Sequence, residues 1–173
     1  MYQKKLKQIF ILSGKARSGK DTVAEIIEEF YKDKKVIKLS YSYYLKDYLK
    51  RMNLYNEKNK PRSLMQDFGQ NLLRKIDNNF LINRLLEDIE VFSYFYDIII
   101  VTDARMKNEI IIPKEKYENV KTIRIVRDNY DNGLTEKEKE NITETDLDNY
   151  NNFDKIIYND SNLKENVWRY LNE

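Results

Sequence analysis

The amino-acid sequence predicts an α/β fold in which a parallel sheet is covered by helices on both faces. Apolar runs of strand length alternate with segments of helical periodicity, as in sheets joined by right-handed helical crossovers. The run at residues 97–102 (DIIIVT) is continuously apolar at its centre, which is typical of a parallel strand buried on both faces. A glycine turn at residues 14–19 separates the first apolar run from the first helical segment.

The strands are predicted from short apolar runs bounded by polar or turn-forming residues. The runs are residues 8–13, 36–40, 97–102, 122–126 and 153–158.

The helices are predicted from apolar positions that recur with a period near 3.6 residues. In residues 63–76, Leu64, Phe68 and Leu72 have this spacing and are expected to form one buried stripe. Residues 127–152 are polar and lack a regular pattern, and a loop of this length in a small domain is usually a functional lid or a disordered segment. The predicted helices are residues 21–32, 43–52, 63–76, 79–92 and 163–171.

Composition restricts the possible functions. A chain of 173 residues fits one domain. Its 31 basic and 29 acidic residues leave a net charge of +2, so no broad nucleic-acid-binding surface is expected. The chain has no cysteine and no histidine, which excludes disulfides, Cys/His zinc sites and a histidine base. The N-terminal residues lack the pattern of a secretion signal and no run is long enough to span a membrane, so we expect a cytosolic protein.

Residues 14–22 (GKARSGKDT) match the phosphate-binding pattern G-x-x-x-x-G-K. Glycines let successive backbone N–H groups point at one phosphate, and the following helix adds its N-terminal N–H groups and dipole. A lysine at the position of Lys20 reaches the β- and γ-phosphates of a nucleotide. A simple glycine turn is the alternative, but two of the four glycines in the chain lie here at the required spacing. The predicted phosphate-binding residues are Gly14, Lys15, Ala16, Arg17, Ser18, Gly19, Lys20, Asp21 and Thr22.

Asp21 departs from the usual pattern, in which serine or threonine follows the lysine. A carboxylate there can hold Mg²⁺, directly or through water. It can equally stabilise the N-terminus of a helix, and the two roles are compatible. The Thr22 hydroxyl can bond either a phosphate or the helix backbone.

The loop with Asp21 resembles that of the phage-type deoxynucleoside monophosphate kinases and, second, that of the animal-type phosphomevalonate kinases. Weaker similarities to these families follow in order along most of the chain. They are Leu39-Ser40, Leu45-Lys46-Asp47, residues 65–69 (MQDFG), Arg74, Asn79-Phe80, residues 101–105 (VTDAR), Val126-Arg127, Thr143-Glu144 and Asn159-Asp160.

The resemblance implies the three-layer αβα sandwich of P-loop NTPases, of the nucleoside monophosphate kinase type, with strand order 2-3-1-4-5. It implies a single domain, residues 1–173, with an acceptor-binding helical region at about 41–92 and a lid-like segment at about 127–152. The implied reaction uses ATP and Mg²⁺ to convert a nucleoside or deoxynucleoside monophosphate into the diphosphate. A kinase for another phosphorylated metabolite, such as phosphomevalonate, and an ATP-dependent switch without fast transfer remain alternatives.

Asp103 and Arg105 end the most apolar strand, and ligands of open α/β sheets bind at the carboxyl ends of strands. Asp103 is therefore a candidate catalytic residue that can bind Mg²⁺ through water or orient the acceptor. Arg105 is a candidate for a substrate phosphate, since a guanidinium binds phosphate with two parallel hydrogen bonds. The alternative is a surface pair of little energetic value.

The resemblance places further candidates at the acceptor and in the lid-like segment. Arg127 is the candidate that would neutralise the transferred phosphoryl group, whereas strand alternation suggests that Arg124 faces solvent. Residues 135–140 (TEKEKE) are expected to be a solvated turn or short helix. Tyr41, Tyr43 and Tyr44 are more simply packing residues than base-stacking ones. The acceptor candidates are Ser40, Lys46, Gln66, Arg74 and Arg105. The sequence predicts small-molecule substrates, with no nucleic-acid or membrane partner, and indicates neither the oligomeric state nor the base preference.

Overall fold

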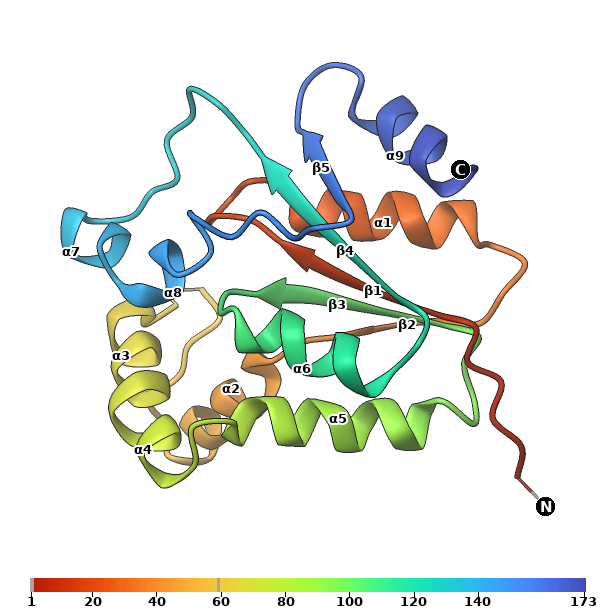
Figure 1. Cartoon of the computed structure of the whole chain (residues 1–173). Helices are drawn as coiled ribbons and strands as arrows, with labels where there is room; N and C mark the ends of the chain where they lie inside the picture. Colours follow the sequence, from red (N-terminus) through yellow and green to blue (C-terminus); the bar gives the residue numbers. More distant parts are fainter. Residues whose placement is uncertain (1, 59) are drawn as a thin grey trace.

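A computed structural model describes residues 2–58 and 60–173 and contains a five-stranded parallel sheet with strand order β2-β3-β1-β4-β5 (Figure 1). This order confirms the predicted topology. The central strand β1 pairs with β3 on one side and β4 on the other. The strands are β1 (Gln8–Ser13), β2 (Val36–Leu39), β3 (Ile98–Ala104), β4 (Val120–Val126) and β5 (Lys155–Tyr158).

Helices cover both faces of this sheet, as predicted (Figure 1). None of the helices in the described residues is long and apolar enough to cross a membrane. The helices are α1 (Lys20–Phe30), α2 (Ser42–Arg51), α3 (Arg62–Asp67), the π-helical η1 (Phe68–Leu73), α4 (Arg74–Ile76), α5 (Phe80–Phe92), α6 (Asn108–Lys116), α7 (Glu136–Lys139), α8 (Ile142–Thr145) and α9 (Leu163–Leu171).

The alternation of side chains along β1 divides the core into two layers. Ile9 and Ile11 pack with residues of α2, α5 and α6 on one face. Phe10 and Leu12 pack with residues of α1 and α9 on the other. All four are at most 1% exposed, so the central strand is buried on both faces, as its apolar sequence indicates.

The parallel strands end at one edge of the sheet. There β1 is followed by the predicted phosphate-binding residues 14–22, which we call the phosphate loop. Figure 1 shows the short helices α7 and α8 of the lid-like segment beyond this edge, next to α3. Helix α7 lies within residues 135–140 and begins with a capping box, in which the side chains of Thr135 and Glu138 each accept the other residue's backbone N–H. The short-helix alternative for these residues is therefore confirmed.

The stripe predicted for Leu64, Phe68 and Leu72 is wrong at its last position. Leu72 is 46% exposed and Leu73 is 3% exposed. The π-helical turn η1 inserts one residue into the helical repeat, which rotates the following residues around the axis. Leu73 therefore takes the buried place.

Helix α6 was not predicted, because its sequence lacks helical periodicity and contains Pro113. A proline has no N–H to donate to the carbonyl four residues earlier, which here belongs to Glu109. The hydroxyl of Tyr41, buried between α2 and α6, donates to the Glu109 carbonyl instead. A tertiary hydrogen bond thus replaces the missing helical one.

Candidate active site

The phosphate loop has the conformation that its glycines permit. A Cβ atom on Gly14 would lie 2.4 Å from Ser18 Oγ and 2.6 Å from the Ile125 carbonyl oxygen. Gly19 has a φ of 101° and Arg17 a φ of 56°, both in the left-handed region. These conformations turn the chain from β1 into α1, so the N-terminus of that helix faces the loop.

Lys20 is folded back on the loop. Its Nζ donates to the carbonyl oxygens of Gly14 at 2.8 Å and Lys15 at 2.7 Å. Burial, and next the positive charge of Arg105, lower the pKa of Lys20 to about 7, while Glu144 and Asp21 oppose this shift. A phosphate would supply the anionic partner that two carbonyl groups do not.

Two features of Ser18 bear on phosphate binding: the state of its hydroxyl and the anchoring of its carbonyl. The buried hydroxyl of Ser18 has no hydrogen-bond partner in the described residues, which is a deficit that a ligand oxygen would satisfy. The Ser18 carbonyl accepts a 2.8 Å bond from Asn159, which follows β5 and supports the loop from behind. The same amide lies 2.2 Å from the position of a Cβ on Gly19, and the φ of 101° itself favours glycine there.

A cavity of about 500 Å³ opens beside the loop. A smaller cavity of about 90 Å³ shares Ser42, Gln66 and Arg105 with it and extends toward α4 and α5. The larger cavity is lined by Ala16, Arg17, Lys20, Asp21, Ser40, Ser42, Lys46, Lys60, Arg62, Met65, Gln66, Thr102, Asp103, Arg105, Leu134, Thr143 and Glu144.

A chain of alternating charges runs from the smaller cavity to the loop, and we call it the arginine side: Arg74, Glu109, Arg105 and Glu144. Glu109 Oε1 pairs with Arg74 at 2.8 Å, and Oε2 accepts the backbone N–H groups of Arg105 at 2.7 Å and Met106 at 3.1 Å. Arg105 in turn pairs with Glu144 at 2.7 Å. Burial raises the pKa of Glu109, and Arg74 opposes the increase. Glu109 therefore fixes the relative positions of the two arginines.

The two predicted metal ligands differ in availability. Asp103 accepts the backbone N–H groups of Tyr41 at 2.8 Å and Ser42 at 3.1 Å, so its carboxylate caps the N-terminus of α2. Asp21 is exposed on the first turn of α1 and lines the larger cavity. No cluster of three metal-ligating side chains occurs among the described residues. A site with one or two carboxylates fits Mg²⁺ bound mainly by phosphates and water.

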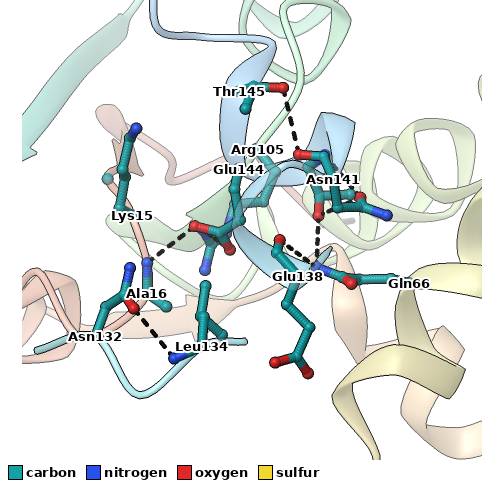
Figure 2. Close-up of polar contacts among 12 residues, drawn as sticks. Lys15, Ala16, Gln66, Arg105, Asn132, Leu134, Glu138, Asn141, Glu144 and Thr145 are labelled. Carbon is teal, nitrogen blue, oxygen red and sulfur yellow. Dashed lines mark hydrogen bonds and ion pairs between the residues drawn. The ribbon is translucent and has the colours of Figure 1, made fainter. Parts of the chain in front are cut away.

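Carboxylates of the lid-like segment dock on the phosphate loop and its surroundings. Glu144 Oε2 accepts the N–H of Ala16 at 3.2 Å (Figure 2). Asp148 pairs with Lys15 at 3.0 Å and with Arg124 at 3.4 Å. The lid-like segment therefore packs against the loop in this structure.

Of the acceptor candidates, Ser40, Lys46, Gln66 and Arg105 line the larger cavity, and Arg74 lines the smaller one. The amide of Gln66 donates to the Glu138 carbonyl at 3.3 Å and to Thr143 Oγ1 at 3.4 Å. It thus connects α3 to the lid-like segment.

Arg124 and Arg127, near the start of the lid-like segment, lie in positions that the sequence did not indicate. Arg127 lies outside the residues that line either cavity. Its guanidinium lies 5.1 Å from the ring centre of Tyr130, and it donates to the Arg17 carbonyl at 3.4 Å. The solvent-facing position expected for Arg124 is wrong, because its side chain is 14% exposed and donates to Ser13 Oγ at 2.9 Å. The lid-like segment covers the side of the strand that alternation left open.

Three further residues belong to the site and were not predicted. Glu109 lies on the helix that the sequence did not reveal. Glu144 enters the sequence prediction only through the resemblance at Thr143-Glu144, and a single acidic residue gives no indication that it is buried. Arg62 lines the larger cavity and follows Pro61, where a loop-to-helix boundary was the only available signal.

Comparison with solved structures identifies the fold. The Mycobacterium tuberculosis APS kinase CysC in complex with AMPPNP and APS matches with a TM-score of 0.61 and 13% identity over 96% of each chain. Shikimate kinase from Bacteroides thetaiotaomicron matches with a TM-score of 0.52 and 13% identity over 95% of each chain. The chain has the α/β fold of P-loop kinases. No family model and no curated relative matches it in sequence.

Proposed function

We propose that the protein transfers the γ-phosphoryl group of ATP to a nucleoside or deoxynucleoside monophosphate, giving the diphosphate. The observation that carries this proposal is the shared cavity, in which the phosphate loop faces Lys46 and Arg105. A cavity with phosphate-binding groups on two opposite sides suits two phosphorylated substrates that meet end to end.

The donor side consists of residues 14–22. Backbone N–H groups of the loop and of the α1 N-terminus bind the donor phosphates, and Lys20 turns from the loop carbonyls to the β- and γ-phosphates. Mg²⁺, when bound, supplies further neutralisation of the phosphate charges. Asp21 lies on the helix turn nearest the phosphates and is its best-placed ligand, since Asp103 is engaged by the backbone of α2.

The acceptor side combines cations with a small, partly apolar cavity. Leu45, Met65 and Leu81 line the smaller cavity together with the amide of Gln70. The Gln70 Nε2 atom is buried and has no hydrogen-bond partner among the described residues. A nucleobase offers such a site both an apolar face for the aliphatic side chains and polar edge atoms for the amide.

The transfer itself requires no strong base, because the attacking oxygen of a monophosphate is already anionic. The protein must bring two polyanions together and reduce their repulsion. Lys20 does this from the loop, and Arg105 does it from the arginine side. The absence of histidine from the sequence is compatible with this chemistry.

A coupled assay for ADP release tests the proposal with the common ribo- and deoxynucleoside monophosphates and with phosphomevalonate as acceptors. We expect at least one monophosphate to be converted and Lys20→Ala to abolish the signal. Turnover of phosphomevalonate, but of no nucleoside monophosphate, would show that the proposed acceptor class is wrong. Slow ATP hydrolysis without any acceptor dependence would instead identify a nucleotide-dependent switch.

A further inference from the structure

Glu144 places an anion in the phosphate-binding end of the larger cavity. Its side chain is 7% exposed. One carboxylate oxygen accepts the N–H of Ala16, a residue of the phosphate loop, and the other pairs with Arg105. Figure 2 shows Glu144 between these two groups. Both groups belong to the surfaces that face a substrate phosphate under the proposed function.

The position of Glu144 is supported by its neighbours in the lid-like segment. Asp146 accepts the backbone N–H of Lys107 at 2.7 Å, and Asp148 pairs with Lys15. Tyr130 donates to the Ala16 carbonyl at 2.6 Å. These contacts lie on both sides of Glu144 in the sequence, so the carboxylate is held against the loop by the folded segment.

A carboxylate and a phosphate compete for such a position. Both accept hydrogen bonds from backbone N–H groups and pair with a guanidinium through two oxygens. Both are negative, and like charges in a partly buried site repel each other strongly. We propose that Glu144 is an internal competitor of the nucleotide: it occupies the phosphate loop and Arg105 in the free protein and is displaced by the donor phosphates.

This inference rests on the proposed function and adds an order of events to it. Displacement of Glu144 removes the partner of Arg105, which then becomes available to the acceptor phosphate. Donor binding thus prepares the acceptor side. The same competition lowers the apparent affinity for the donor by the fraction of molecules in which Glu144 occupies the loop.

Calorimetric titration of ADP, pyrophosphate and adenosine into three proteins tests the inference. The proteins are the wild type, Glu144→Gln and the control Glu140→Gln, which removes the same charge from an exposed position of the same segment. We expect Glu144→Gln to bind ADP and pyrophosphate about tenfold more tightly than the wild type, as when a competing state with about 90% population is removed. Adenosine affinity and the control should not change.

The outcomes separate the inference from the proposed function. If Glu144→Gln binds ADP with the same affinity as the wild type, or more weakly, the inference is overturned and the proposed function stands. Failure of ADP and pyrophosphate to bind either protein overturns the function, and the inference with it.

A measurement on the wild type alone covers the case in which Glu144→Gln does not fold. Hydrogen exchange is followed with and without saturating pyrophosphate. We expect faster exchange in residues 142–147 and slower exchange in residues 14–22. Unchanged or slower exchange in residues 142–147 overturns the inference.

Discussion

The phosphate loop and the arginine side present positive charge in different ways. The phosphate loop is one continuous stretch, residues 14–22, that presents backbone N–H groups and a single buried lysine. The arginine side takes its four side chains from α4, α6, α8 and the residues after β3, and Glu109 and Glu144 are each under 10% exposed. The loop depends on local backbone conformation, whereas the arginine side depends on ion pairs between distant segments.

This difference predicts how each side responds to mutation. Removing a side chain from the loop should cost activity with little cost in stability, because the backbone conformation is set by Gly14 and Gly19. Removing the Glu109 carboxylate from the arginine side should leave buried donors without a partner. Stability should then fall together with activity.

The largest effect is expected for Glu109→Ala. The substitution leaves Arg74 and two backbone N–H groups without their acceptor in a site where Glu109 is 2% exposed. We expect the free energy of unfolding to fall by about 3–5 kcal/mol, measured by urea denaturation. Glu115→Ala, at an exposed position of the same helix, is the control and should change it by less than about 0.5 kcal/mol. Equal losses in the free energy of unfolding for the two variants would show that Glu109 does not organise the arginine side.

Lys20→Ala tests the loop. We expect kcat/KM for the phosphoryl transfer to fall by roughly 10²–10³-fold, as when a group that stabilises transferred charge is removed. The fold should be retained, because Lys20 bonds only loop carbonyls among the described residues. Lys32→Ala, at an exposed position just after α1, is the control and should leave the transfer unchanged. Transfer that persists within about tenfold of the wild type would contradict the assignment of the loop.

Arg105→Ala tests whether the arginine side serves the acceptor. Loss of a guanidinium that binds a phosphate should cost about 1.5–3 kcal/mol, or roughly tenfold to a hundredfold in kcat/KM for the acceptor. Affinity for a non-hydrolysable ATP analogue should not fall. Titration calorimetry with the analogue and then with the acceptor separates the two sites, with the exposed helix variant Arg84→Ala as control. Normal acceptor binding with weakened analogue binding would show that the two substrate sites are reversed.

The smallest effect is a proton taken up with the nucleotide. In the free protein the pKa of Lys20 is lowered to about 7 from an ordinary 10.5, so between these values Lys20 is mostly neutral. A bound polyphosphate favours the ammonium form and raises the pKa. Nucleotide binding above pH 7 should therefore take up a fraction of one proton, and affinity should weaken as the pH rises.

Calorimetry of ADP binding in two buffers of different ionisation enthalpy measures this uptake. Lys20→Met should abolish it, and Lys15→Ala should retain it. Uptake that survives in Lys20→Met would assign the titration to another group.

The sequence by itself determined the parts that depend on neighbouring residues. The loop at residues 14–22 was predicted because glycine spacing and the adjoining strand and helix are all local features. The bounds of β1 and α9 were predicted without error for the same reason. The strand order was predicted through a resemblance carried mainly by this loop.

Only the tertiary structure decided which charges pair. Arg74 and Glu109 are 35 residues apart, and Arg105 and Glu144 are 39 apart. Helix α6, which carries Glu109, contains a proline, and the hydroxyl of Tyr41, the residue before α2, donates to the carbonyl that this proline leaves without a donor. The burial of Arg124 likewise depends on how the lid-like segment folds back. Parallel strands bring segments that are distant in the chain to one edge of the sheet, so pairing at that edge depends on packing and not on sequence spacing.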